Sequence, residues 1–104
     1  MNVTIERERL ARIFTELCET SSPSREEKGV SDYLQSVFAA LSPDFTCEDD
    51  SASSTGADCG NLIFRFEGSS AAEPVFFACH MDTVQPGQGV QVNRSGDIFT
   101  SKGA

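Results

Sequence analysis

Several features typical of common protein functions are missing from this chain of 104 residues. No apolar run approaches the roughly 20 residues that a helix needs to cross a bilayer, and the first residues lack the basic stretch and apolar core of a signal peptide. Basic residues are few, since 8 Lys and Arg stand against 16 Asp and Glu. Nucleic-acid binding rewards clustered Lys and Arg. We therefore expect neither a nucleic-acid partner nor a membrane partner.

Motifs of several enzyme and metal-binding classes are also absent. The sequence has no internal repeat, no phosphate-binding loop and no Gly-x-Ser-x-Gly nucleophile turn. Its four cysteines, at positions 18, 47, 59 and 79, include no Cys-x-x-Cys pair, which argues against a zinc ribbon or a redox motif. Without a secretion signal, we expect a cytoplasmic protein with four free thiols. We expect Cys79 to be a small core residue.

Two helices are predicted in the first 43 residues. Apolar residues at helical spacing predict a helix from about Thr4 to Glu19. The segment Ser24–Glu27 has the Ser-x-x-Glu form of a capping box, which predicts that a second helix begins there. That helix should end at Ser42-Pro43. The apolar stripes of the two helices are Leu10, Ile13, Phe14 and Leu17, and Val30, Tyr33, Leu34, Val37, Phe38 and Leu41.

Strands are predicted in the rest of the chain. Phe45–Glu48 is typical of a short strand near a sheet edge, and Asn61–Phe66 of another, with a polar surface loop over residues 49–58 between them. The unbroken apolar run Pro74–Cys79 predicts a strand covered on both faces, as in an α/β sheet. Turn residues between Val90 and Phe99 predict a hairpin.

The only histidine of the chain, His80, follows that apolar run directly, and Asp82 stands two residues further on. Ligands of α/β sheets gather at the carboxyl ends of the strands. In an extended backbone residues i and i+2 point to the same side, so Asp82 is placed to hold the imidazole. Neutral imidazole is the commonest protein metal ligand, and a carboxylate often orients it. A structural, hydrogen-bonded histidine is the alternative.

The residues around His80 resemble a known motif. Phe76–Gly87 is similar to the first metal-binding motif of the co-catalytic zinc exopeptidases, an apolar strand that ends in His-x-Asp-Thr-Val-x-Pro-Gly. Three further elements match in order: Ser21–Glu27, Gly60–Ile63 and Ser101–Ala104. The sequence around His80 and the Ser-Lys-Gly-Ala ending are most similar to the peptidase T-like branch, the tripeptide aminopeptidases.

The resemblance implies an activity and roles for two residues. It implies hydrolysis of an amide bond near the N-terminus of a short peptide, by a water that two zinc ions share. His80 would ligate one zinc, and Asp82 would be the catalytic-site residue that holds its ring. An N-acyl-amino-acid deacylase of the same family, or a fold fragment with a structural His80 and no activity, stays open. A homodimer of the larger enzyme also stays open.

The resemblance also implies a fold and a larger protein. The predicted order of helix, helix and strands, together with the resemblance, implies an α/β fold, a three-layer α/β/α sandwich with a mixed sheet. Members of the family are several times longer, so residues 1–104 are expected to be the N-terminal portion of the catalytic domain, without the lid or dimerisation domain. Alone, the chain should be inactive and bind no zinc tightly, because zinc sites need three or four protein ligands. Sheet surface around Val75, Phe76 and Phe77 should then be uncovered.

Overall fold

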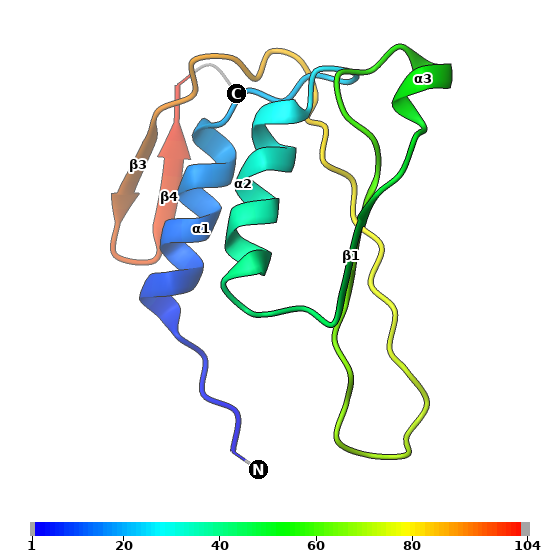
Figure 1. Cartoon of the computed structure of the whole chain (residues 1–104). Helices are drawn as coiled ribbons and strands as arrows, with labels where there is room; N and C mark the ends of the chain where they lie inside the picture. The colour runs from blue at the N-terminus through cyan, green and yellow to red at the C-terminus, as the bar shows by residue number, and fades with distance from the viewer. Residues whose placement is uncertain (1, 103–104) are drawn as a thin grey trace.

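The computed structural model describes residues 2–102. In this range two helices lie side by side, with one two-stranded antiparallel sheet next to each of them (Figure 1). Helices α1 (Arg7–Glu19) and α2 (Lys28–Ala39) come first, then β1 (Phe45–Glu48), the short α3 (Ala52–Thr55), β2 (Leu62–Arg65), β3 (Val92–Ser95) and β4 (Ile98–Ser101). The predicted helices, the strands on either side of residues 49–58 and the final hairpin are confirmed. The bounds of β1 are those predicted, and the bounds of the other elements differ slightly.

The expected fold is wrong for the described residues. Strands β1 and β2 form one antiparallel pair and β3 and β4 another, and no mixed sheet joins them within residues 2–102. The predicted buried strand at Pro74–Cys79 is not a strand. Val75, Phe76 and Phe77 expose 76–86% of their surface. An apolar run becomes a buried strand only where other strands pair with it and other layers cover it, and nothing described here does either.

Aromatic contacts hold each sheet to its helix. Phe38 of α2 stacks on Phe64 of β2 with ring centroids 4.4 Å apart, and Phe14 of α1 meets Phe99 of β4 edge to face at 5.2 Å. Such pairs are each worth about 0.5–1.5 kcal/mol beyond the burial of their area. The two helices are joined by the Tyr33 hydroxyl, which donates to Glu16 Oε2 at 2.5 Å.

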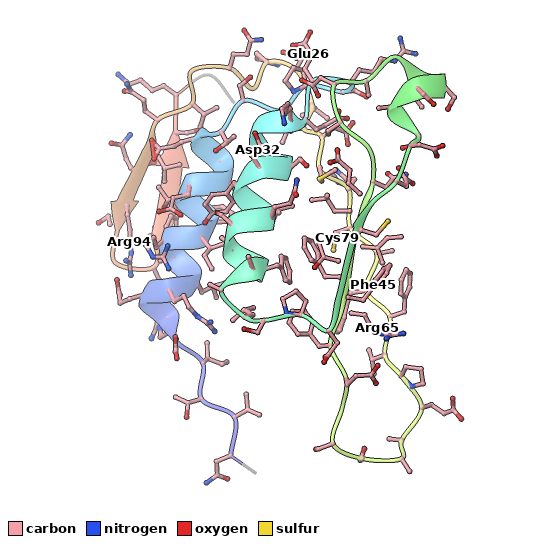
Figure 2. The ribbon with its side chains drawn as sticks, viewed as in Figure 1. Glu26, Asp32, Phe45, Arg65, Cys79 and Arg94 are labelled. Carbon is pink, nitrogen blue, oxygen red and sulfur yellow. The ribbon has the colours of Figure 1, made fainter. Side chains whose placement is uncertain are left out.

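The final hairpin is also docked by charge. Arg94 of β3 extends toward α1 (Figure 2), and its guanidinium donates to both carboxylate oxygens of Glu8 at 2.8 and 2.9 Å. The strands turn through Gly96 and Asp97, and Gly96 has the positive φ, 63°, that such two-residue turns need. The turn residues thus explain why this hairpin was predictable from the sequence.

The core that results is small. The buried apolar residues are Ala11, Val30, Cys59 and Val90, whereas Leu10 and Phe14 of the α1 stripe remain 62% and 47% exposed. The radius of gyration is 15.9 Å, against roughly 13 Å for a compact domain of about 100 residues. Apolar surface at α1 and at residues 75–77 is therefore uncovered. None of the helices within residues 2–102 has the length and hydropathy of a membrane-spanning segment.

The predicted capping box at Ser24–Glu27 is wrong. Residues Pro23–Glu26 form a turn, in which the Glu26 amide donates to the Pro23 carbonyl at 2.9 Å and Arg25 takes a positive φ of 76°. Helix α2 therefore begins three residues later than expected, at Lys28, with Glu27 as its N-cap. The amide of Lys28 is satisfied instead by Asp58 Oδ1 at 3.1 Å, a partner far away in the sequence.

Candidate functional site

His80 and Asp82 lie together on the surface segment that follows the apolar run. The imidazole Nδ1 of His80 is 2.7 Å from the backbone oxygen of Asp82 and 3.1 Å from its carboxylate Oδ1. The predicted contact between the Asp82 carboxylate and the ring of His80 is therefore present. It is accompanied by the backbone oxygen of the same residue, which the sequence did not suggest.

This geometry determines which ring nitrogen carries the proton. A carbonyl oxygen can only accept a hydrogen bond, so at 2.7 Å Nδ1 of His80 must be the donor. In the neutral imidazole, Nε2 is then the nitrogen with the free lone pair. The His80 side chain is 83% exposed. The arrangement thus offers an accessible nitrogen ligand with its ring held from the other side, as in metal-binding histidines.

The segment that carries His80 and Asp82 is tied to the start of the chain. Ser22 is 1% exposed, and its hydroxyl donates to the backbone oxygen of Met81 at 2.8 Å. The amide of Thr83 donates to the backbone oxygen of Ser22 at 2.8 Å, and a parallel β-bridge joins Pro23 to Thr83. Two of the motifs that carry the family resemblance, far apart in the sequence, therefore meet at this site.

Further metal ligands do not gather around His80 within residues 2–102. The one group of three ligand-type side chains in that range consists of Glu27, Asp58 and Cys59, whose ligand atoms lie within 4.8 Å of one another. Burial, and then the negative charges of Asp58 and Glu27, raise the pKa of the Cys59 thiol. The protonated thiol is a poor ligand, and Asp58 already caps α2. This cluster is better explained as the cap of a helix.

The polar loop before β2 is organised by one carboxylate. Asp49 accepts hydrogen bonds from the amide and hydroxyl of Ser51 and from the amide and side chain of Asn61, at 2.6–3.1 Å. These bonds, those of the Ser51 and Asn61 side chains above all, lower the pKa of Asp49 well below its ordinary value. The loop also contains α3, which composition alone did not reveal. Asn61 of the family-like element Gly60–Ile63 thus has a structural role here.

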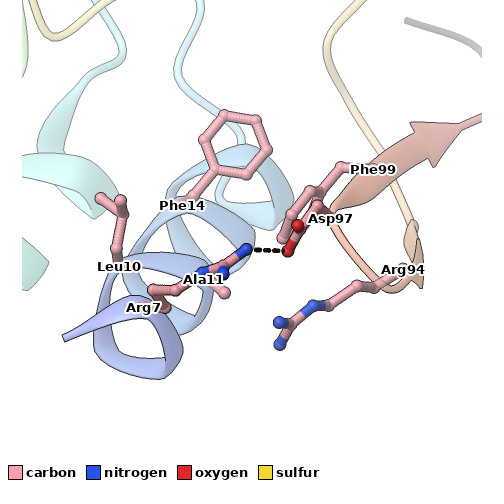
Figure 3. Close-up of a pocket in the computed structure, with 7 residues that line it drawn as sticks. All are labelled: Arg7, Leu10, Ala11, Phe14, Arg94, Asp97 and Phe99. Atoms are coloured by element: carbon pink, nitrogen blue, oxygen red, sulfur yellow. Dashed lines mark ion pairs between the residues drawn. The ribbon is translucent and has the colours of Figure 1, made fainter. Parts of the chain in front are cut away.

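A separate hollow of about 480 Å³ lies between α1 and the β3–β4 hairpin (Figure 3). Its apolar wall consists of Leu10, Ala11, Phe14 and Phe99. Its two guanidinium groups are already paired, Arg7 with Asp97 at 2.5 Å and Arg94 with Glu8 at 2.8 Å. His80 and Asp82 do not line it. The hollow is therefore separate from the candidate metal site, and none of its lining residues belongs to that site.

The four cysteines are free thiols, as predicted. Cys79 precedes His80 on the exposed segment (Figure 2) and is itself exposed, so the prediction that it is a core residue is wrong. The prediction assumed that Pro74–Cys79 is a strand covered on both faces, and no other element covers this segment within residues 2–102. Cys59 is the buried thiol instead.

Sequence reasoning missed the role of Ser22 and the part played by the Asp82 carbonyl. The motif Ser21–Glu27 carries the resemblance, and its capping-box form points to Ser24 and not to Ser22. A hydrogen bond between residues 59 positions apart leaves no local pattern. Of the element Ser101–Ala104, Gly103 and Ala104 lie outside the described residues.

Comparison with known proteins gives a relative but no family and no activity. No family model matches the chain, and no solved structure matches it. The chain is 36% identical over 87 residues to the uncharacterized protein YqjE of Bacillus subtilis (strain 168). The match covers 84% of this chain and 23% of the relative. The chain thus spans about a quarter of the length of the curated relative that it matches.

Proposed function

We propose that this chain is the His80-bearing part of a dinuclear zinc peptidase of the peptidase T-like kind, which hydrolyses an amide bond near the N-terminus of short peptides. The observation that carries the proposal is the held imidazole: Nδ1 of His80 donates to Asp82, and the side chain is exposed on its other side. The resemblance of residues 76–87 to the zinc exopeptidase motif adds the reaction class. Placement in the cytoplasm is part of the proposal, supported by the four free thiols.

The residues of the site suit the first step of assembling such a centre. Nε2 of His80 would hold one zinc ion. The Asp82 carboxylate, 3.1 Å from Nδ1, would keep the proton on that nitrogen and make Nε2 a stronger electron donor. When bound, a zinc pair lowers the pKa of a water and polarises the scissile carbonyl.

Of the three or four protein ligands that such a zinc site needs, the described part of this chain supplies one, His80. Zinc sites take three or four protein ligands, and His80 belongs to no three-ligand group within residues 2–102. The proposal therefore requires further ligands from a longer chain. A relative of which the match covers 23% is consistent with that requirement.

The proposal is tested on the longest natural protein that contains this segment. His80→Ala should remove one zinc ion per chain, measured by metal analysis, and nearly abolish hydrolysis of a tripeptide. Asp82→Asn should keep the zinc but weaken affinity or activity by roughly 10–100-fold. Asp50→Asn, which changes an exposed carboxylate elsewhere, is the matched control and should leave both unchanged.

Two results would change the conclusion. Full tripeptide hydrolysis by His80→Ala would remove His80 from the metal site and overturn the proposal. Cleavage of N-acyl amino acids in place of tripeptides, lost in His80→Ala, would keep the metal site and replace the peptidase by a deacylase.

A further inference from the structure

Ser22 and His80 hold opposite sides of one peptide unit. The carbonyl of Asp82 and the amide of Thr83 belong to the same peptide bond, which is planar and rigid. On one edge of this planar unit, the Thr83 amide donates to the Ser22 backbone oxygen at 2.8 Å. On the other, the Asp82 carbonyl accepts the proton of His80 Nδ1 at 2.7 Å. The orientation of this plane therefore decides whether Nδ1 keeps the closer of its two acceptors, the Asp82 carbonyl at 2.7 Å, beside the Asp82 carboxylate at 3.1 Å.

The hydroxyl of Ser22 fixes the preceding peptide as well. It donates to the Met81 carbonyl at 2.8 Å, and Thr83 Oγ1 donates back to the Ser22 carbonyl at 3.3 Å. Ser22 thus bonds to the residues on both sides of Asp82. Because Ser22 is 1% exposed, water cannot readily replace its hydroxyl. Hydrogen bonds in such a chain also polarise one another, so the bond to Thr83 makes the Asp82 carbonyl a better acceptor.

We propose that Ser22 is a positioning residue, which holds the Asp82–Thr83 peptide so that the proton of neutral His80 stays on Nδ1 and Nε2 is left free. Its value for metal binding rests on the proposed function. The effect on the tautomer does not, because it follows from contacts within the chain alone.

The test is nitrogen NMR of the imidazole at alkaline pH, without metal, in the 104-residue chain. His80 is the only histidine, so the ring signals need no assignment. The wild-type chain should have its proton mainly on Nδ1. Ser22→Ala loses the hydroxyl bond to the Met81 carbonyl and keeps the backbone bond to Thr83. The ratio of the Nδ1–H to the Nε2–H form should therefore fall in this variant, by up to about five-fold, which corresponds to a whole hydrogen bond of roughly 1 kcal/mol.

Two variants separate positioning from general destabilisation. Ser21→Ala changes the exposed neighbouring hydroxyl and should leave the ratio at the wild-type value. Ser22→Thr keeps a hydroxyl and should restore the ratio. If Ser22→Ala does not fold, judged by its amide spectrum, Thr83→Val removes the Oγ1 donor to Ser22 and should lower the ratio in the same direction.

Each result decides the proposal. A wild-type ratio in a folded Ser22→Ala chain, or in Thr83→Val if Ser22→Ala is unfolded, would make Ser22 merely structural and overturn it. An equal fall in Ser21→Ala would also overturn it, since the effect would not be specific. A fall specific to Ser22 supports it even if His80→Ala in the longer protein keeps full peptidase activity; only the proposed function would then fail.

Discussion

Gly60 is the position at which the addition of a single methyl group should damage the fold most directly. A Cβ built on Gly60 would lie 2.1 Å from the backbone oxygen of Asp49 and 2.8 Å from its Oδ1. The first of these atoms belongs to the backbone and cannot swing away. Gly60→Ala must therefore push apart the two segments that join β1 to β2.

The contacts at risk can be named. The Asp49 amide donates to the Asn61 carbonyl at 2.9 Å, and the Gly60 amide donates to Glu48 Oε1 at 2.9 Å. Overpacking costs about 1–3 kcal/mol, and each hydrogen bond that is lost costs roughly 0.5–1.5 kcal/mol. Alanine returns about 0.4–1 kcal/mol by restricting the unfolded chain. We therefore expect Gly60→Ala to lower the free energy of unfolding by about 2 kcal/mol.

The measurement is urea unfolding followed by far-ultraviolet circular dichroism. The matched control is Gly68→Ala, because a Cβ on Gly68 would have nothing within 4 Å and its φ is not in the left-handed region. That control should be unchanged or slightly more stable. If Gly60→Ala unfolds at the same urea concentration as Gly68→Ala, the close approach to Asp49 is not a constraint in solution and the reasoning fails.

Two further predictions concern Asp49 and the thiols. Hydrogen bonds from Ser51 and Asn61 lower the pKa of Asp49 in the folded chain. Ionised Asp49 therefore stabilises the fold at pH values above the ordinary pKa of Asp. This contribution is lost as the pH falls through the folded-state pKa. Asp49→Asn should therefore flatten the loss of stability toward acid pH, and an equally steep loss in the variant would contradict this account. In the native chain a thiol reagent should modify exposed Cys79 first and buried Cys59 last, because burial also raises the pKa of Cys59 and the thiolate is the reactive form. After denaturation without reductant all four cysteines should react, whereas protected pairs would contradict the free thiols.

Local patterns in the sequence predicted the elements whose causes are local. The β3–β4 hairpin follows from turn residues at Gly96 and Asp97, and α1 and α2 follow from apolar residues at helical spacing. The contact of Asp82 with the His80 ring was also predictable, because two residues of separation place both side chains within reach. In each case the interacting groups are neighbours in the chain, so a short window of sequence contains the physical cause.

The predictions that are wrong concern segments whose structure depends on contacts with distant parts of the chain. Burial of an apolar run depends on what packs against it. The run Pro74–Cys79 has the composition of a covered strand, but Phe76 is 86% exposed. The Ser24–Glu27 pattern fits a capping box, but a turn occupies it and Asp58 caps α2 instead.

Local sequence thus determined the helices, the hairpin and the pairing of His80 with Asp82. Only the tertiary structure decided how that pair is held. The hydrogen bond that Ser22 donates to Met81 and the one that it accepts from Thr83 join segments about 60 residues apart. Likewise, the fold needs a residue without a side chain at position 60, and the hydrogen bond from Asn61, only because the tertiary structure brings Asp49 against both residues. A hydrogen bond or a close approach between distant segments depends on where the whole chain places them, and no local spacing specifies that placement.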